Sequence, residues 1–308
     1  MPDAFHQQTP SGLPHALAAY LIWGFLPLYL LLVRSVPPFE FVAWRIVWSV
    51  PICLAIVLVL GQTRQVINAL RDPRVLMTLI ASALLIGVNW FIYIWAVLRG
   101  HVLAASLGYY INPLLNVFLG TVFLGEHLSR RQWVAVGLAG AGIAILLTGA
   151  LTTLWISLSL AASFGTYGLL RKRVAVAALP GLTIETALLL PLSFAIVAFY
   201  AGTPAGSSFG QELGLSAAIV GGGVVTAVPL LLFATAARRM NYSTLGFIQF
   251  IAPTIVFFLG LFVFDEPLKT AQLVCFVFIW TASAIFAWDL VAKRDRARQS
   301  GAIRQPSR

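Results

Sequence analysis

Two charged residues lie inside long apolar stretches of the sequence, where charge is rare. Arg45 and Glu185 are 140 positions apart. Charge at membrane depth is costly and marks a solute or ion pathway by default. An arginine there can receive a carboxylate or the electron-rich face of an aromatic ring, and a glutamate can carry a proton. The alternative for both residues is that the side chain extends to the nearby membrane interface.

A pair of prolines has the same separation. Pro113 and Pro253 fall near the middle of their apolar stretches. A proline inside a helix removes one backbone hydrogen bond and leaves the carbonyl four residues earlier unpaired, here those of Tyr109 and Gln249. Unpaired backbone at membrane depth is tolerated only beside protein or a water-lined cavity. Breaks at matching positions of two halves indicate a transporter's binding site, and the alternative is a packing kink.

Polar side chains at helical spacing accompany the prolines. Ser106 and Asn116 lie on the same helical face as the first proline. Asn89 and Tyr93, four residues apart, share a face of the preceding apolar stretch. Such side chains can hydrogen-bond a solute, or they can join neighbouring helices, which is the usual role of Asn and Gln in membranes. The candidate residues of a solute path are Arg45, Asn89, Tyr93, Ser106, Tyr109, Pro113, Asn116, Glu185, Gln249 and Pro253.

The composition requires these residues to lie in membrane helices. Of 308 residues 60% are hydrophobic and only 10% are charged, and the mean hydropathy is +0.91, which is too apolar for a soluble fold of this size. A spanning helix needs about 20 apolar residues. The sequence therefore predicts an all-α polytopic membrane protein. Its ten predicted transmembrane helices are 14–33, 39–60, 75–98, 102–124, 132–150, 153–170, 182–201, 213–236, 243–264 and 271–291.

Basic residues are divided unevenly between alternate connections. Sixteen Lys and Arg residues fall on the side of the termini and 3 on the other side. The positive-inside rule then places both termini in the cytoplasm and favours an even number of helices. We interpret the basic tail as a topology signal near anionic lipid rather than as a nucleic-acid-binding arm. The 16 residues are Arg64, Arg71, Arg74, Arg130, Arg131, Arg171, Lys172, Arg173, Arg238, Arg239, Lys293, Arg294, Arg296, Arg298, Arg304 and Arg308, and the other 3 are Arg34, Arg99 and Lys269.

The second half of the sequence repeats the first at the same offset of 140 residues. Glu126 matches Glu266, and Gln132 matches Gln272. Because five helices per copy is an odd number, the two copies must cross the membrane in opposite senses, as inverted repeats of transporters do. The predicted organisation is a cytoplasmic tail at 1–13, a first repeat at 14–150, a second repeat at 151–291 and a basic cytoplasmic tail at 292–308.

The inverted arrangement separates the two intramembrane charges in depth. Arg45 and Glu185 lie near ends of their helices that face opposite sides of the membrane. With a rise of 1.5 Å per residue, their levels differ by about 12 Å or more. Separate partners or two water-filled vestibules are therefore expected in place of a direct ion pair.

Several runs of residues are specific enough to compare with known families. They are Asn89-Trp90, Ile94-Trp95-Ala96-Val97, Ala105-Ser106-Leu107-Gly108-Tyr109-Tyr110-Ile111-Asn112-Pro113-Leu114, Phe123-Leu124-Gly125-Glu126, Tyr167-Gly168-Leu169-Leu170-Arg171-Lys172, Ile184-Glu185-Thr186, Val228-Pro229-Leu230-Leu231 and Ser243-Thr244-Leu245-Gly246-Phe247. From about residue 14 to 290 the chain resembles the RarD branch of the EamA-type drug/metabolite transporter superfamily. The resemblance implies two inverted five-helix EamA repeats, an inner-membrane permease and a family label linked to chloramphenicol sensitivity. One difference is that the family usually has His-Arg early in the second helix, where this chain has Trp44-Arg45.

The expected function is secondary transport of a small organic metabolite or drug-like solute, with export by alternating access through a midplane cavity between the repeats. Import of the same solutes, or a non-transporting membrane scaffold or sensor, are the alternatives. The sequence has no G-x-x-x-x-G-K-[ST] loop for ATP and no metal or catalytic constellation, so neither a cofactor nor an enzyme is expected. The expected location is the bacterial inner membrane. Expected partners are the solute and the lipid bilayer, with proton coupling through Glu185 and a homodimer through the small residues 137–142 as further hypotheses.

Overall fold

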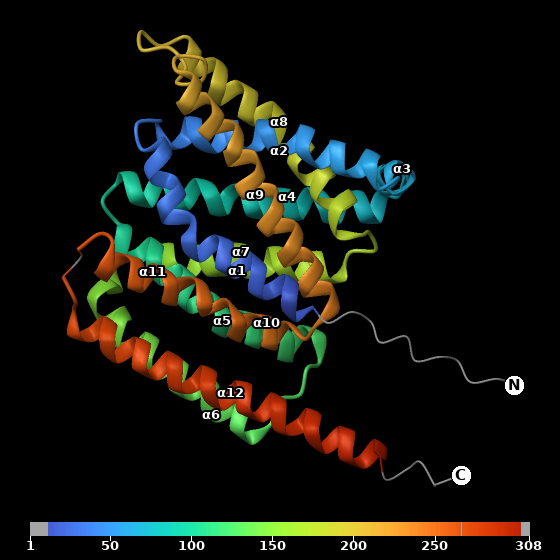
Figure 1. Cartoon of the computed structure of the whole chain (residues 1–308), viewed down its shortest axis with the longest axis vertical. Helices are drawn as coiled ribbons and strands as arrows, with labels where there is room; N and C mark the ends of the chain where they lie inside the picture. Colours follow the sequence, from blue (N-terminus) through green and yellow to red (C-terminus); the bar gives the residue numbers. More distant parts are fainter. Residues whose placement is uncertain (1–11, 266, 303–308) are drawn as a thin grey trace, which may run out of the picture.

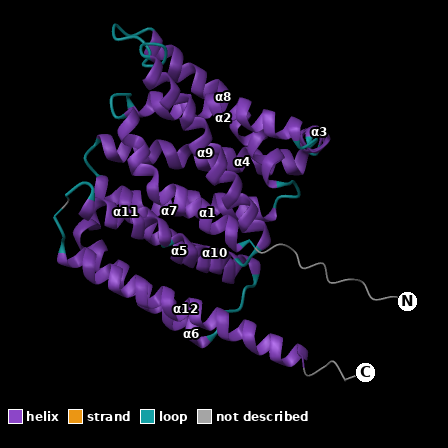
Figure 2. Cartoon of the chain, viewed as in Figure 1, coloured by secondary structure: helices purple, strands orange, loops and turns teal. Residues whose placement is uncertain are grey.

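The computed structural model describes residues 12–265 and 267–302, and within these ranges its regular structure is entirely helical (Figure 2). The long helices lie side by side in one bundle (Figure 1). The elements are α1 Leu13–Leu30, η1 Leu31–Val33, α2 Pro38–Val59, α3 Thr63–Arg71, α4 Pro73–Leu98, α5 Val102–Leu124, α6 Arg130–Leu147, η2 Thr148–Thr153, α7 Leu154–Arg173, α8 Ala178–Ala201, α9 Leu213–Arg239, α10 Tyr242–Gln249, α11 Ile251–Phe262 and α12 Thr270–Ala302, where η marks a 3-10 helix.

Nine helical stretches of the described chain are long and apolar enough to cross a membrane. They are α1 with η1, α2, α4, α5, the end of η2 with α7, α8, α9, α10 with α11, and α12. The remaining long helix, α6, begins with Arg130, Arg131 and Gln132, which lowers its mean hydropathy, and it packs along α12. The prediction of a polytopic helical membrane protein is therefore confirmed, while the tenth span stays a prediction.

The bundle has two edges and a middle (Figure 1). Helices α2 and α8 pack together at one edge, and α6 and α12 pack together at the other. Between them α4 contacts α7, α1 contacts α9 and α11, and α5 contacts α7 and α10. Helix α1 begins and α12 ends at the same end of the bundle, where the short helix α3 also lies. We call this end the α3 end.

Glycines allow the closest helix crossings. A Cβ atom on Gly223 of α9 would lie 2.6 Å from the backbone of Trp48 in α2. A Cβ atom on Gly246 of α10 would lie 2.7 Å from the carbonyl oxygen of Pro113 in α5. A larger residue would push these helices apart, since both contacts are with backbone atoms. Close approach through small residues is the usual means by which membrane helices associate.

Helix ends differ from the predicted ones in several places. The short helix α3 was not predicted because it is too short and too polar to span a membrane. Helix α7 continues to Arg173 and α8 begins at Ala178, so the connection predicted at 171–181 is shorter. The predicted fifth span ends as an α-helix at Leu147, and the tenth continues beyond 291 to Ala302. Hydropathy marks the apolar layer of the membrane, whereas a helix ends where its backbone hydrogen bonds end.

The two prolines have different effects. The predicted ninth helix, 243–264, is divided, since α10 ends at Gln249 and α11 begins at Ile251. Pro253 has no N–H to donate to the Gln249 carbonyl, which explains the break. Helix α5 runs unbroken through Pro113. The expectation of matching breaks in the two halves is therefore wrong for the first half.

Candidate functional site

Arg45 lies on α2, seven residues after the helix begins, and its side chain is directed between α4 and α9. Its Nε donates a 2.8 Å hydrogen bond to Oγ1 of Thr226 in α9. Its Cζ lies 5.3 Å from the ring centre of Trp90 in α4 and 5.7 Å from that of Phe41. A cation over an aromatic face gains about 0.5–2 kcal/mol. These contacts hold the half-buried guanidinium within the bundle rather than at the interface.

Tyrosines surround the Arg45 guanidinium. Tyr29, Tyr93 and Tyr109 are the tyrosines that lie close enough to influence its charge. The rings of Tyr93 and Tyr109 meet edge to face, with 5.7 Å between their centres. Neither of these two hydroxyls has a hydrogen-bond partner in the described ranges, and Tyr109 is 41% exposed. The Tyr109 ring of α5 therefore packs on Tyr93 of α4 and keeps part of its surface exposed. We call Phe41, Arg45, Trp90, Tyr93 and Tyr109 the Arg45 cluster.

The acidic residue Glu40 precedes Arg45 on α2, but it binds the connection between α8 and α9 rather than Arg45. Both oxygens of buried Glu40 accept hydrogen bonds from the connection between α8 and α9. The donors are the Ser207 hydroxyl at 2.6 Å, the Ser208 amide at 2.8 Å and the Ser208 hydroxyl at 2.9 Å. Trp44 joins this arrangement, with its Nε1 3.3 Å from Glu40 and from Ser207. Glu40 therefore fixes a connection at the end of the bundle opposite α3.

Glu185 lies on α8, also seven residues after its helix begins, and it is ion-paired. Its Oε1 lies 3.4 Å from Nη1 of Arg171 in α7, and the two side chains are 2% and 0% exposed. Ser82 of α4 and Tyr167 of α7 also donate hydrogen bonds to the carboxylate. The Arg171 Nη2 donates to the carbonyl of Ala178 at 2.7 Å. Glu185 thus joins three helices and does not extend to the interface.

The separate-partner expectation for the two charges agrees with this geometry. Arg45 contacts Thr226 and aromatic rings, whereas Glu185 contacts Arg171. Arg171, which the sequence places in the basic set on the side of the termini, is buried and paired rather than free at that side. A buried pair of this kind is strongly destabilised when one partner is removed, by about 3–5 kcal/mol.

Three of the candidate polar residues connect helices. The Asn89 amide in α4 donates to the Leu160 carbonyl and to the Ser163 hydroxyl of α7, both at 2.9 Å. The Asn116 amide in α5 donates to Oε1 of Gln249 in α10 at 2.9 Å. All three side chains are buried. Their packing role is therefore visible, while their contact with a solute stays a prediction.

The remaining candidates lie along α5 and α11. Ser106 is partly exposed one turn before Tyr109 of the Arg45 cluster. Pro113 and Pro253 are buried. Pro113 contacts α10 through its carbonyl oxygen, beside Gly246. The structure thus brings Tyr109 near Arg45, with Ser106 one turn earlier on α5, while Glu185 lies toward the α3 end and contacts Arg171, Ser82 and Tyr167.

Basic side chains tie the helices together at the α3 end. The Lys172 ammonium of α7 donates to the carbonyls of Ala237 at 2.9 Å and Met240 at 2.6 Å, where α9 ends. The Arg238 guanidinium of α9 donates to the carbonyl of Val174 at 2.7 Å, just after α7. Cations that bind carbonyls at helix C-termini satisfy otherwise unpaired acceptors. These contacts fasten α7 to α9.

Glu126 is an acidic residue that binds the N-terminus of a helix. It follows α5, and its carboxylate accepts from the backbone amides of Tyr242 at 2.6 Å and Ser243 at 2.8 Å. These amides open α10, so the carboxylate both satisfies unpaired donors and complements the helix dipole. The Tyr242 hydroxyl in turn donates to the Gly165 carbonyl at 2.7 Å. The repeat partner of Glu126, Glu266, lies outside the described residues.

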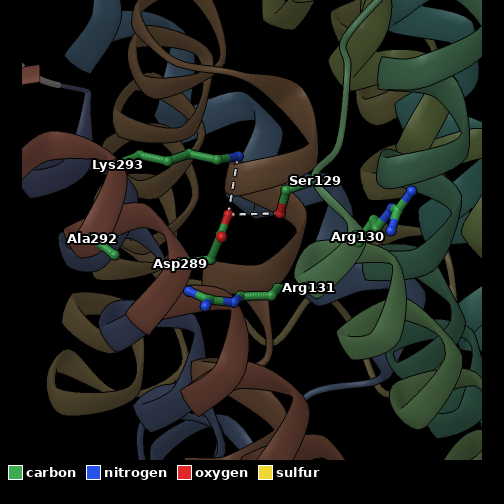
Figure 3. Close-up of a pocket in the computed structure, with 6 residues that line it drawn as sticks. All are labelled: Ser129, Arg130, Arg131, Asp289, Ala292 and Lys293. Atoms are coloured by element: carbon green, nitrogen blue, oxygen red, sulfur yellow. Dashed lines mark hydrogen bonds and ion pairs between the residues drawn. The ribbon is translucent and has the colours of Figure 1, made fainter. Parts of the chain in front are cut away.

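Two surface hollows of about 270 Å³ each contain none of the candidate residues. One lies where α6 begins, against Asp289, Ala292 and Lys293 of α12 (Figure 3). There the Asp289 carboxylate accepts from Ser129 at 2.8 Å and pairs with Lys293 at 2.9 Å, which approach it from two sides. The hollow is therefore part of the junction between α6 and α12, at the opposite edge of the bundle from α2.

Comparisons with known proteins identify the family. A model of the EamA-like transporter family matches residues 10–148. Protein RarD of Salmonella typhi is 45% identical over 92% of this chain and 97% of its own length. The chain belongs to the RarD branch of the EamA family. The EamA chain is therefore a membrane transporter of the bacterial inner membrane with multiple helical spans.

Other comparisons extend beyond the first half of this EamA chain. The uncharacterized transporter YojE of Bacillus subtilis is 39% identical over 96% of this chain and 99% of its own. A solved crystal structure of another protein, 19% identical, has a TM-score of 0.69 and covers 89% of this chain and 96% of that one. That likeness shows a shared fold.

The residue that departs from the RarD pattern faces away from the candidate site. Trp44 of this EamA chain bonds to Glu40 and Ser207, and its ring lies 4.5 Å from that of Phe209. Its neighbour Arg45 is directed toward Thr226 instead. The Trp in place of the usual His therefore belongs to the contact with the α8–α9 connection.

Sequence reasoning missed several residues of the site. Thr226 gave no signal, because a single threonine in an apolar helix is common. Arg171 was missed because residues near the end of a span are assumed to be solvated. Gly181 leaves room for the Arg171 guanidinium, since a Cβ there would lie against it, but this contact is visible only in the structure.

Proposed function

We propose that this EamA chain exports a small organic metabolite or drug-like solute by alternating access between two halves of the bundle. Membership of a transporter family supports the general function. The finer proposal depends on how the two halves pack, and the reciprocal contacts between them are the observation that carries it.

The contacts support ten helices in two inverted repeats. At the offset of 140 residues, α1 corresponds to α7, α4 to α9, and α5 to α10 with α11. Helix α1 packs on α9 and α11, and its counterpart α7 packs on α4 and α5. Helices α2 and α8, α5 and α10, and α6 and α12 each pair with their own counterpart. An inverted repeat requires such reciprocal packing. Because α6 pairs with its counterpart α12, the packing supports α6 as a tenth span.

The position of the helix ends supports cytoplasmic termini. Helix α1 begins and α12 ends at the α3 end, as an even number of spans requires (Figure 1). The residues of the cytoplasmic basic set that the structure describes lie on segments at this end, and Arg34, Arg99 and Lys269 lie on segments at the other. We therefore propose that the α3 end is cytoplasmic.

In this orientation the structure corresponds to a state closed toward the cytoplasm. Lys172, Arg238 and Glu126 fasten α5, α7, α9 and α10 at that end. The Arg45 cluster lies nearer the opposite, outer end, and Tyr109 of this cluster is partly exposed. Alternating access would release the first set of contacts and open the path from Ser106 and Tyr109 past Asn116 and Gln249.

Proton coupling through Glu185 is part of the proposal. The carboxylate is buried and shares hydrogen bonds with Ser82 and Tyr167, so a change in its charge alters contacts among α4, α7 and α8. Glu185→Gln is expected to transport without pH dependence. Normal transport with an unchanged pH profile in this variant would remove Glu185 from the coupling mechanism.

A separate hypothesis is that the small residues 137–142 form the contact of a homodimer. Gly142 is used within the chain, since a Cβ there would lie 2.7 Å from Phe278 of α12. Gly137 has open space around it. If α6 forms a dimer contact, Gly137→Leu is expected to convert a dimer to a monomer in detergent, as measured by light scattering.

The direct test compares small molecules inside and outside cells that lack, carry or overproduce the protein. Arg45→Ala is the functional control. Export predicts that a solute leaves cells in proportion to the wild-type protein and does not leave with the variant. Accumulation inside would reverse the direction. No change across a broad panel, including aromatic compounds and chloramphenicol, would contradict transport and favour a scaffold or sensor.

A further inference from the structure

The guanidinium of Arg45 carries an unneutralised charge inside the bundle. In the described ranges the ion pairs are Arg171 with Glu185 and Lys293 with Asp289, and neither involves Arg45. Only its Nε has a hydrogen-bond acceptor within those ranges, the Thr226 hydroxyl. The four N–H groups on the two terminal nitrogens are therefore left for an acceptor from outside the protein.

The acidic residue on the same helix as Arg45 and the acidic residue at its repeat position both have other partners. Glu40 on the same helix accepts three hydrogen bonds from Ser207 and Ser208. Glu185, the repeat partner of Arg45, is paired with Arg171. A charge in a membrane span is otherwise paired or lines a wet path. The protein thus supplies a cation without its counter-ion.

The side chains around the Arg45 guanidinium are aromatic rings, two of which carry a phenol hydroxyl. The rings of Trp90 and Phe41 lie 5.3 and 5.7 Å from the guanidinium carbon. Tyr93 and Tyr109 lie close to it with their rings packed edge to face, and their hydroxyls have no hydrogen-bond partner in the part of the chain that the structure describes. A flat ligand with one anionic end matches this set of contacts.

We infer that the transported solute is an organic carboxylate with a planar apolar part. Arg45 binds the carboxylate through its two terminal nitrogens, a geometry in which arginine forms two parallel hydrogen bonds. The hydroxyls of Tyr93 and Tyr109 add donors, and the rings of the Arg45 cluster contact the planar part. A cationic solute is repelled by the same charge. This inference rests on the proposed transport function.

The test measures binding to the purified full-length protein in a neutral detergent. Benzoate, 3-phenylpropionate and indole-3-propionate are each compared with the corresponding primary amide and primary amine by isothermal titration calorimetry. At least one carboxylate is expected to bind, with its amide and amine about 30- to 100-fold weaker, the value of a charge-assisted hydrogen-bonded contact. Equal affinity of the amide or the amine, or no binding of any carboxylate, overturns the inference.

Variants assign the carboxylate to Arg45. Arg45→Gln is expected to lose the discrimination between acid and amide, and Arg45→Lys to keep part of it because the charge remains. Arg99→Gln, which removes a basic residue from an exposed position, is the matched control and should bind as the wild type does. Trp90→Leu tests the wall and should weaken all aryl carboxylates together. Full discrimination in Arg45→Gln would overturn the assignment.

Transport assays separate this inference from the proposed function. A carboxylate that binds through Arg45 but does not cross proteoliposome membranes would contradict transport and leave the binding site intact. A neutral or cationic solute that crosses in an Arg45-independent way would support transport and overturn the carboxylate inference.

Discussion

Arg45 and Glu185 occupy equivalent places in the two halves of the chain and have opposite surroundings. Each lies seven residues after its helix begins, on α2 and α8. Glu185 is 2% exposed and is paired with Arg171. Arg45 is half-buried and has aromatic rings and one threonine around it. In the second half the charge of Glu185 is neutralised by Arg171, whereas in the first half the charge of Arg45 is not neutralised by an acidic side chain of the described residues.

This difference separates stability from binding. A buried ion pair that loses one partner leaves an uncompensated charge, so the Glu185 region should govern folding. A cation without an acidic partner among the described residues adds little to folding, so Arg45 should matter mainly for contact with a ligand. Transporters need both features, because a rigid half is required for the other half to move against.

The largest expected effect comes from breaking the neutralised pair. Arg171→Met leaves the Glu185 carboxylate buried without its cation, and the free energy of unfolding should fall by about 3–5 kcal/mol. The check is thermal unfolding in detergent. Arg64→Met, at an exposed position of α3, is the control and should change little.

Removing both charges sharpens the same comparison. In the double variant Arg171→Met with Glu185→Leu, apolar packing replaces the ion pair, and most of the lost stability should return. A double variant as unstable as Arg171→Met alone would contradict the account, because the loss would then come from packing and not from the unpaired carboxylate.

A smaller effect is expected from moving Arg45 without removing it. A Cβ on Gly222 would lie 2.9 Å from Cγ of Arg45 and 3.1 Å from the Phe41 ring. Gly222→Ala should therefore shift the guanidinium and weaken carboxylate binding about tenfold, or about 1.4 kcal/mol. The adjacent Gly221→Ala has its nearest neighbour at 3.6 Å and is the matched control. Equal affinities of the two variants would argue against the position assigned to Arg45.

The smallest effect concerns the residue beside Arg45. Trp44 bonds to Glu40 and Ser207 and packs on Phe209, and within the described residues it has no hydrogen bond or ring contact with Arg45. Trp44→His, which restores the residue usual in the family, should change carboxylate affinity by no more than about two- to threefold, the scale of a substitution outside the site. Calorimetry with the same aryl carboxylates checks this. A tenfold change would extend the site to this position.

The sequence was sufficient for the class of fold but not for all helix ends. Apolar length locates a span, because the membrane core has a fixed thickness. It does not reveal that α10 stops at Gln249 while α5 continues through Pro113. That contrast depends on how each helix packs, since neighbouring groups determine whether the carbonyl freed by a proline bends the helix.

The candidate site was predicted in part for a similar reason. Arg45 and Glu185 were visible because charge in apolar sequence is rare. Which of them is neutralised depends on Arg171, which approaches Glu185 only after α7 and α8 fold together. Likewise, the polar residues Asn89 and Asn116 were visible by type, and their partners on α7 and α10 were not. Sequence thus identified the unusual groups, and three-dimensional packing decided their partners.

The most direct test of the account is transport of an aryl carboxylate by proteoliposomes that contain wild-type or Arg45→Ala protein. The variant should remain folded, because it loses the Thr226 hydrogen bond and the ring contacts but no ion pair within the described residues. The account predicts that the wild-type protein moves the carboxylate across the membrane and that this stably folded variant does not. Transport by Arg45→Ala at the wild-type rate would contradict it.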